Sequence, residues 1–378
     1  MIINNVKLVL ENEVVHGSLE VQDGEIRAFA ESQSLLPEAM DGEGGWLLPG
    51  LIELHTDNLD KFFTPRPKVD WPAHSAMSSH DALMVASGIT TVLDAVAIGD
   101  VRDGGDRLEN LEKMINAIEE TQKRGVNRAE HRLHLRCELP HHTTLPLFEK
   151  LVQREPVTLV SLMDHSPGQR QFANREKYRE YYQGKYSLTD AQMQQYEEEQ
   201  LALAARWSQP NRESIAALCR ARQIALASHD DATHANVAES HQLGSVIAEF
   251  PTTFEAAEAS RKHGMNVLMG APNIVRGGSH SGNVAASELA QLGLLDILSS
   301  DYYPASLLDA AFRVADDESN RFTLPQAVRL VTKNPAQALN LQDRGVIGEG
   351  KRADLVLAHR KGNHIHIDHV WRQGKRVF

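Results

Sequence analysis

Short apolar runs alternate with amphipathic stretches through the middle of the chain. Runs of this length, bounded by polar or turn-forming residues, predict buried β-strands at 51–55, 89–95, 131–138, 157–163, 224–228, 246–250, 266–270 and 295–300. The stretches between them predict helices, which include 78–87, 107–124, 210–222, 253–263 and 284–292. Eight such strands with intervening helices favour an α/β fold, a (β/α)8 barrel over residues 51–342, rather than an open sheet.

The two ends of the chain have a different pattern. Residues 1–50 and 343–378 contain short alternating runs separated by turn signals, so we expect them to form one small β-sandwich domain beside the barrel. Residues 166–208 are unusually polar and rich in Tyr, Gln, Glu and Arg. We expect a helical insertion over the barrel mouth there. The alternative is a solvated helical excursion with no role in function.

Five of the predicted strands end in a side chain of the kind that binds metals. The first strand is followed by His55 and Asp57, which lie two residues apart and so leave a strand on the same face. The others end in Glu138, His165, His229 and Asp301. The carboxyl ends of barrel strands meet at one mouth, where the chemistry of such barrels takes place. We therefore expect these six residues to surround one site.

Three carboxylates and three imidazoles at one mouth create an electrostatic problem. Each uncompensated buried ion costs several kcal/mol, and like charges add repulsion. Divalent cations would remove the conflict, so we predict two metal ions, bridged by Glu138. Imidazole and carboxylate ligands suit Zn as the first expectation, with Mn or Fe as alternatives.

Charge and composition limit the classes of molecule that we expect this protein to bind. The 378 residues carry a formal net charge of −12, which argues against nucleic acid as the main partner. The start of the chain does not have the pattern of a signal peptide, and no stretch approaches the ~18 apolar residues that a membrane span needs. The two cysteines indicate a reducing compartment. We expect a cytoplasmic protein that binds a small molecule and no membrane, and we leave a homo-oligomer open.

Two further segments join these residues in a family resemblance. The stretch 49–55, ending in His55, together with 332–341 and 348–356, resembles the opening and closing signatures of the amidohydrolase superfamily. The resemblance implies a metal-dependent hydrolase barrel with a β-sandwich made from both ends. Two features depart from the family pattern. His55-Thr56-Asp57 stands where the family usually has His-x-His, and the later histidines follow the fourth and fifth predicted strands rather than the fifth and sixth.

The segments 55–61, 163–169 and 228–231 resemble a narrower branch, which acts in phosphonate degradation by the carbon–phosphorus lyase pathway. That resemblance implies a diphosphatase that splits α-D-ribose 1-methylphosphonate 5-triphosphate into the 5-phosphate and pyrophosphate. We expect a metal-bound hydroxide to attack the phosphorus nearest the ribose while Asp301 accepts its proton. The alternatives are a cyclic amidohydrolase or deaminase of the same superfamily, and a scaffold that has lost catalysis.

A triphosphate requires cations and backbone donors. The glycine-rich segment after the seventh strand allows a close approach to an anion, and two basic residues follow the first strand. Sugar hydroxyls have candidate partners beyond the fifth strand. The expected substrate-binding residues are Arg276, Gly277, Gly278, Ser279, His280, Arg66, Lys68, Asp230 and His234, with Asp231 as an alternative to the last two.

Overall fold

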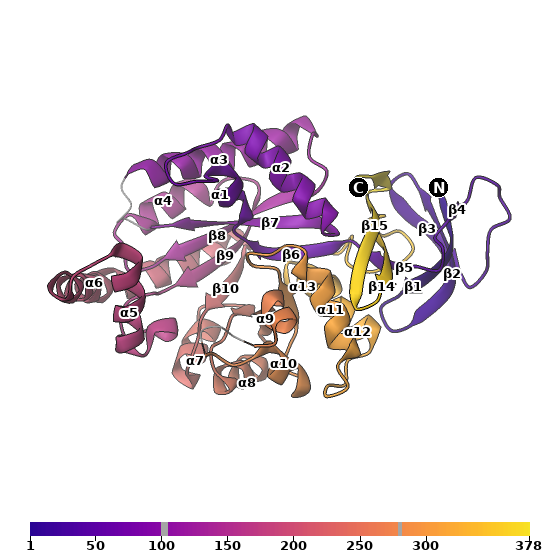
Figure 1. Ribbon diagram of the computed structural model, residues 1–378. Coiled ribbons are helices and arrows are strands. Elements are labelled where there is room, and N and C mark those ends of the chain that lie inside the picture. The colour runs from indigo at the N-terminus through magenta and orange to yellow at the C-terminus, as the bar shows by residue number, and fades with distance from the viewer. Residues whose placement is uncertain (100–104, 279–281) are drawn as a thin grey trace.

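The computed structural model describes residues 1–99, 105–278 and 282–378, and most of them form a parallel barrel with helices outside it (Figure 1). Neighbouring barrel strands pair in parallel, in sequence order from the first to the eighth. A bridge between Thr56 and Asp301 brings the first strand beside the end of the eighth. The barrel strands are β6 (Leu51–Thr56), β7 (Ile89–Ile98), β8 (Glu130–Glu138), β9 (Val157–Met163), β10 (Ala225–His229), β11 (Ile247–Glu249), β12 (Asn266–Gly270) and β13 (Ile297–Ser299). The expected (β/α)8 barrel is confirmed.

The alternation of side chains along β8 explains how the barrel separates its core from its chemistry. Leu133, Leu135 and Cys137 point outward into an apolar core shared with the surrounding helices. The intervening Arg136 and Glu138 line the cavity at the barrel mouth. The helices around the barrel are α1 (Asn58–Phe63), α2 (Ala73–Ala86), α3 (Gly105–Arg124), α4 (Thr144–Leu151), α7 (His234–Gln242), α8 (Phe254–Lys262), α9 (Ala271–Arg276), α10 (Ala286–Gln291), α11 (Ser306–Asp316), α12 (Leu324–Arg329) and α13 (Lys333–Ala338).

The segment after β9 is helical, and it does not end where the sequence pattern indicated. A 3-10 turn, η1 (Arg170–Phe172), leads into α5 (Arg175–Tyr186), and a capping box at Thr189 starts α6 (Asp190–Arg222). This 33-residue helix continues through Pro210 and becomes the helix that packs on the barrel, so no boundary falls at 208. Within the parts of the chain that the structure describes, no helix combines the length and the apolar character needed to cross a membrane.

Both ends of the chain meet in a second sheet. Its order is β16-β15-β14-β5-β1-β2-β3, and β4 pairs with β1. The pairing makes one continuous sheet rather than two separate layers, and residues from both of its halves share one apolar core. Its strands are β1 (Ile2–Val9), β2 (Val14–Gln22), β3 (Glu25–Ala30), β4 (Met40–Asp41), β5 (Trp46–Pro49), β14 (Leu355–Lys361), β15 (His364–Arg372) and β16 (Lys375–Arg376). The exact domain boundaries remain a prediction.

Candidate active site

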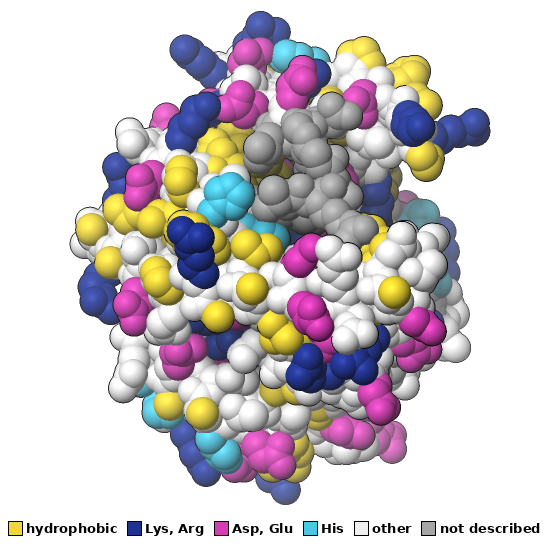
Figure 2. Space-filling model, turned by 90° about the vertical axis from the view of Figure 1, so that its left-hand side faces the viewer, with side chains coloured by type: hydrophobic (Ala, Val, Ile, Leu, Met, Phe, Trp, Pro, Cys, Tyr) yellow, Lys and Arg dark blue, Asp and Glu magenta, His cyan; other side chains and the backbone are white. Residues whose placement is uncertain are grey.

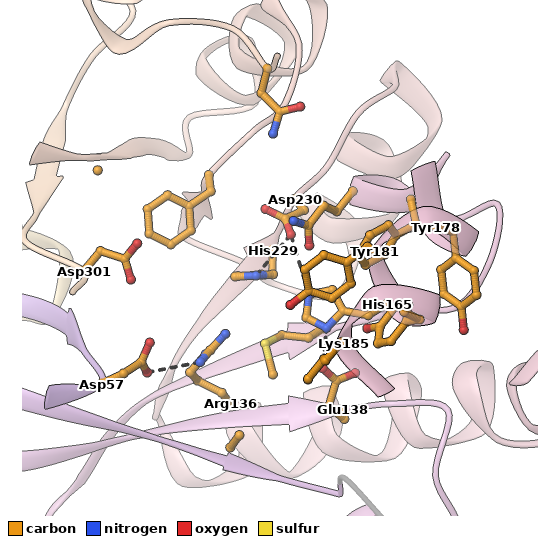
Figure 3. Close-up of a pocket in the computed structure, with 18 of the residues that line it drawn as sticks. Asp57, Arg136, Glu138, His165, Tyr178, Tyr181, Lys185, His229, Asp230 and Asp301 are labelled. Atoms are coloured by element: carbon orange, nitrogen blue, oxygen red, sulfur yellow. Dashed lines mark hydrogen bonds and ion pairs between the residues drawn. The ribbon is translucent and has the colours of Figure 1, made fainter. Parts of the chain in front are cut away.

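The carboxyl ends of the barrel strands open into a cavity of about 710 Å³ (Figure 3). All six residues predicted as metal ligands line this one cavity, although they are spread over almost 250 positions of the sequence. The reason is geometric, because parallel strands in a barrel deliver their last residues to the same mouth. The lining residues in question are His55, Asp57, Glu138, His165, His229 and Asp301.

A first group of ligand-type side chains forms where the first and eighth strands meet. The Nε2 atom of His55 lies 3.7 Å from Asp57 Oδ2 and 3.7 Å from Asp301 Oδ1. His55 is buried, and the two carboxylates are about one-third exposed to the cavity. One imidazole nitrogen and two carboxylate oxygens thus face a common point, an arrangement that suits a divalent cation.

A second group lies between the fourth and fifth strands. Asp230 Oδ2 is 3.2 Å from His229 Nε2 and 3.7 Å from His165 Nε2. We expected Asp230 to contact a sugar, but the structure places its carboxylate between these two imidazoles. Together the three side chains form a candidate site with two nitrogens and one oxygen donor.

Glu138 does not lie where a bridge between the two groups would have to be. It accepts a short hydrogen bond from His165 Nδ1, whereas the Nε2 atom of the same ring faces Asp230 (Figure 3). Inward-facing residues alternate along β8, so Arg136 occupies the position between the groups and Glu138 lies one step further along the strand. The predicted bridging role of Glu138 therefore disagrees with this geometry.

Glu249, at the end of β11, is the carboxylate that lies between the groups, and the sequence analysis overlooked it. It is fully buried, accepts a 2.7 Å hydrogen bond from His229 Nδ1, and lies 3.2 Å from His55 Nδ1. A carboxylate behind a histidine fixes the ring so that its other nitrogen faces the ligand. The rule that found the other strand ends would have found Glu249 too, because it follows the apolar run 246–248.

Arg136 supplies the positive charge among these acids. Its guanidinium lies 3.1 Å from Asp57 Oδ1 and interacts electrostatically with Glu249, Glu138 and Asp301 as well. Burial would raise the pKa of Asp57, but Arg136 and then His55 outweigh it and hold that pKa below its usual range. Burial raises the pKa of Asp301, and His55 opposes this effect without cancelling it. The two acids of the first group therefore differ in how readily they accept a proton.

The donor atoms of both groups fit divalent metal ions. Each group combines imidazoles, which bind metals in their neutral form, with carboxylates, and this is the ligand set of Zn, Mn and Fe sites. In addition, the second carboxylate oxygen of Glu249, Oε2, is buried without a hydrogen-bond partner among the described residues. Such orphaned polar atoms are costly unless a further charge stabilises the cluster.

Only some of the predicted substrate-binding residues line the cavity. Arg276 and Gly278 line the cavity, as does Asp230. The remaining described candidates lie outside the lining and are exposed: Arg66, Lys68, His234 and Gly277. Ser279 and His280 fall outside the described residues. Their contribution to substrate binding stays a prediction.

Asp231, the alternative partner for sugar hydroxyls, accepts hydrogen bonds from two other residues of the protein. Its Oδ1 accepts a 2.9 Å bond from Arg170 Nε, and its Oδ2 accepts a 2.7 Å bond from Ser240 Oγ. It is buried, and it does not line the cavity. The structure thus gives Asp231 a supporting position behind the site.

Comparison with known proteins agrees with this fold. The sequence profile described as "Amidohydrolase family" matches residues 84–378. The chain belongs to the amidohydrolase family. Over 100% of both chains it is 98% identical to a curated protein of Escherichia coli (strain K12), alpha-D-ribose 1-methylphosphonate 5-triphosphate diphosphatase.

Solved structures share the architecture at much lower sequence identity. N-isopropylammelide isopropylaminohydrolase from Burkholderia multivorans is 18% identical, with 99% of this chain and 97% of that chain covered and a TM-score of 0.61. N-acetylglucosamine-6-phosphate deacetylase from Thermotoga maritima is 14% identical, with 100% and 99% covered and a TM-score of 0.59. At such identities the likeness describes the fold alone.

The structure also shows which barrel strands the two later histidines follow. His165 follows β9, the fourth barrel strand, and His229 ends β10, the fifth. The sixth strand, β11, ends in Glu249, where the family pattern would place a histidine. The described barrel has no additional strand before them, so the departure is a property of this chain and not a miscount.

Proposed function

We propose that this chain is a diphosphatase that hydrolyses α-D-ribose 1-methylphosphonate 5-triphosphate to the 5-phosphate and pyrophosphate. The observation that carries the proposal is the 98% identity, over the full length of both chains, to the Escherichia coli protein of that name. The cavity supports it, since imidazole and carboxylate groups for metal ions and the exposed Arg276 line the same space.

The proposal includes two divalent ions, one at each ligand group, with Zn expected first and Mn or Fe as alternatives. His55, Asp57 and Asp301 would hold one, and His165, His229 and Asp230 would hold the other. When bound, such ions would lower the pKa of water from 15.7 to about 7 and so provide a nucleophile at neutral pH. Glu249 would orient the imidazoles of His55 and His229 from behind.

In the proposed reaction Asp301 accepts the proton of the attacking water. Its carboxylate faces the cavity, and its burial raises its pKa, which makes it a better proton acceptor than Asp57. The attack falls on the phosphorus nearest the ribose, and Arg276 would stabilise the departing pyrophosphate by charge. Asp57 stays ionised beside Arg136 and serves as a ligand.

The cytoplasmic location expected from the sequence is part of the same proposal. Cys137 and Cys219 are both free thiols and both buried, as in proteins of reducing compartments.

Phosphorus NMR tests the proposed function directly. The metal-loaded protein is incubated with the ribose triphosphate in heavy-oxygen water. We expect pyrophosphate to form together with the 5-phosphate, with the label in the 5-phosphate because the phosphorus nearest the ribose is attacked. Label in pyrophosphate would place the attack elsewhere. Release of orthophosphate alone, or no change in the triphosphate, would contradict the diphosphatase assignment.

A further inference from the structure

Three Lys or Arg side chains of the described residues line the cavity: Arg136, Lys185 and Arg276. Arg136 is engaged with Asp57 on the cavity floor. Arg276 follows β12, the seventh barrel strand, and Lys185 belongs to α5 in the insertion after the fourth strand. Arg276 is among the residues predicted from the sequence to bind substrate, and Lys185 is not.

Three other basic residues of the insertion bind carboxylates that do not line the cavity. Arg170 is buried and binds Asp231 and Glu239. Arg175 and Arg179 both bind the carboxylate of Glu197, on the neighbouring helix. In contrast, no carboxylate of the described chain is within ion-pair distance of Lys185. Lys185 is therefore the described cation of the insertion that is both directed into the cavity and available to an anion.

A packed aromatic cluster fixes the helix that carries Lys185. Phe172, Tyr178, Met193 and Tyr196 form its buried core, and Tyr182 packs against them. The ammonium of Lys185 lies 5.8 Å from the ring centre of Tyr182 and 5.2 Å from that of Tyr186. Tyr182 and Tyr186 line the cavity together with Lys185. The insertion thus forms a wall of the active cavity.

Lys185 lies at the end of the cavity away from the first ligand group. In Figure 3 Asp57 and Asp301 lie on one side, Lys185 and Tyr181 on the other, and Arg136 between them. The barrel order agrees, because the fourth strand is opposite the eighth in a ring of eight. A substrate whose reacting phosphorus sits between the ligand groups therefore extends one end toward the insertion.

The side of the cavity formed by α5 and α6 carries little net charge, so it suits an end of the substrate that is itself weakly charged. Besides Lys185, the residues of α5 and α6 that line the cavity include one acid, Glu199, together with Gln200 and tyrosines. On the face of the molecule shown in Figure 2, Lys and Arg side chains lie next to hydrophobic side chains, a class in which the figure includes tyrosine. A phosphonate monoester carries a single negative charge, whereas a pyrophosphate group carries several. The tyrosine hydroxyls and rings suit a sugar.

We propose that Lys185 binds the methylphosphonate group on carbon 1 of the ribose, so that the insertion recognises the end of the substrate that does not react. This inference rests on the proposed function and adds a specificity-determining residue to it. Arg276, which follows the seventh strand and lines the same cavity, then serves the triphosphate end.

Two substrates separate these roles. We compare ribose 1-methylphosphonate 5-triphosphate with ribose 5-triphosphate, which has no phosphonate. Lys185→Gln should raise KM for the first about tenfold, as loss of a charge-assisted hydrogen bond does, and leave KM for the second and both kcat values nearly unchanged. Lys185→Arg should restore most of the lost KM. Arg276→Ala should raise KM for both substrates, because both contain the triphosphate.

The matched control is Lys262→Gln on α8, an exposed lysine outside the cavity, which should change neither KM. Equal effects of Lys185→Gln on both substrates, or no effect on either, would overturn the inference. Pyrophosphate release by the wild-type protein reports on the proposed function separately. Calorimetry with ribose 1-methylphosphonate 5-phosphate and ribose 5-phosphate needs no turnover, and a preference for the first that survives in Lys185→Gln would also overturn the assignment.

Discussion

Asp230 and Asp301 both have left-handed backbone conformations, with φ of 55° and 54°. Residues other than glycine rarely adopt this conformation, and aspartate and asparagine tolerate it best. At both positions the chain has just left a barrel strand, and the side chain faces the cavity. The backbone at each strand end therefore restricts which residue can stand there, as strained positions at functional sites often do.

Replacing Asp301 with Asn tests its role without disturbing this backbone. Because asparagine tolerates the same φ but cannot accept the proton, we expect kcat to fall at least about 100-fold while the melting temperature stays close to that of the wild type. Pyrophosphate release and thermal unfolding measure the two effects. Near-normal turnover would remove Asp301 from the proposed mechanism.

A second cluster of ionisable residues is buried between α2 and the barrel. His131 donates from Nδ1 to Asp94 at 2.9 Å and from Nε2 to Asp81 at 2.9 Å, and His80 donates to Asp94 at 2.6 Å. Burial would lower the pKa of His131, but Asp94 and Asp81 outweigh it and raise that pKa to about 9. An imidazolium held between two carboxylates thus joins β7, β8 and α2.

This cluster makes stability depend on pH. Since the folded pKa of His131 is above 6.5, its ordinary value, its contribution is complete below about pH 6.5 and is lost as the pH rises through about 9. His131→Gln should lower the free energy of unfolding by about 3–5 kcal/mol at pH 6 and by less at pH 9. Urea unfolding at both pH values measures this difference. An equal loss at both would show that His131 is neutral in the folded protein.

How far the sequence predicts the site depends on the residue. Strand-end residues such as His55 and His229 could be found because an apolar run followed by a ligand is visible in one dimension. Arg136 lies two residues before Glu138 and on the same face, so the period of a strand could have indicated it. Lys185 has no such signal, because its place depends on how α5 packs over the mouth. The geometry does not support the bridge predicted at Glu138, because Arg136, one step earlier on the same face of β8, lies between the two groups.

At the scale of elements, α6 connects the insertion to the barrel wall. Its first half packs with α5, and its second half packs in the apolar core around β8 and β9 through Ile215 and Cys219. The sequence indicated a helix over 210–222 and an insertion ending near 208, where the polar composition rich in Tyr, Gln, Glu and Arg ends. A proline inside a helix, such as Pro210, normally interrupts it. The helix is nevertheless continuous, because tertiary packing on both sides of the proline outweighs the lost hydrogen bond.

Asn211, directly after that proline, fixes α6 to the loop that follows Glu138. Its buried side-chain amide donates to the carbonyls of Leu139 at 2.8 Å and His141 at 2.9 Å. Asn211→Ala removes the side-chain donor of both carbonyls and leaves His141 only a 3.4 Å bond from the Thr144 backbone N–H, so we expect the free energy of unfolding to fall by about 1–3 kcal/mol. Glu213→Ala, on the exposed face of the same helix, should change it by less than about 0.5 kcal/mol. Denaturant unfolding distinguishes the two, and equal losses would argue against this contact.

At the scale of the molecule, the sheet of the two chain ends lies at the end of the barrel opposite α5 and α6 (Figure 1), the two helices that line the cavity. Glu130, the first residue of β8, forms two ion pairs. Its Oε2 atom lies 2.6 Å from Arg344 Nη1, and its Oε1 atom lies 3.0 Å from Arg352 Nη1. Arg344 also donates to Thr91 near the start of β7. Burial would raise the pKa of Glu130, but the arginines hold it at about 2. These ion pairs join the C-terminal segment to the closed end of the barrel.

Glu130→Gln separates stability from catalysis. Two partly buried guanidinium groups lose their shared counter-charge, so we expect the free energy of unfolding to fall by about 3–5 kcal/mol, with kcat and KM unchanged because the residue is at the opposite end of β8 from Glu138. In the wild type this contribution should diminish as the pH falls from 4.5 toward 2. A large change in kcat would show that the two ends of the barrel are coupled.

The chain begins and finishes in that same sheet, remote from the barrel mouth (Figure 1). A tether attached to Met1 or to Phe378 would therefore hold the molecule by its back and leave the entrance facing solution. Either end can carry the handle by which the protein is captured on a sensor chip or resin, and small anionic ligands would still reach the cavity freely.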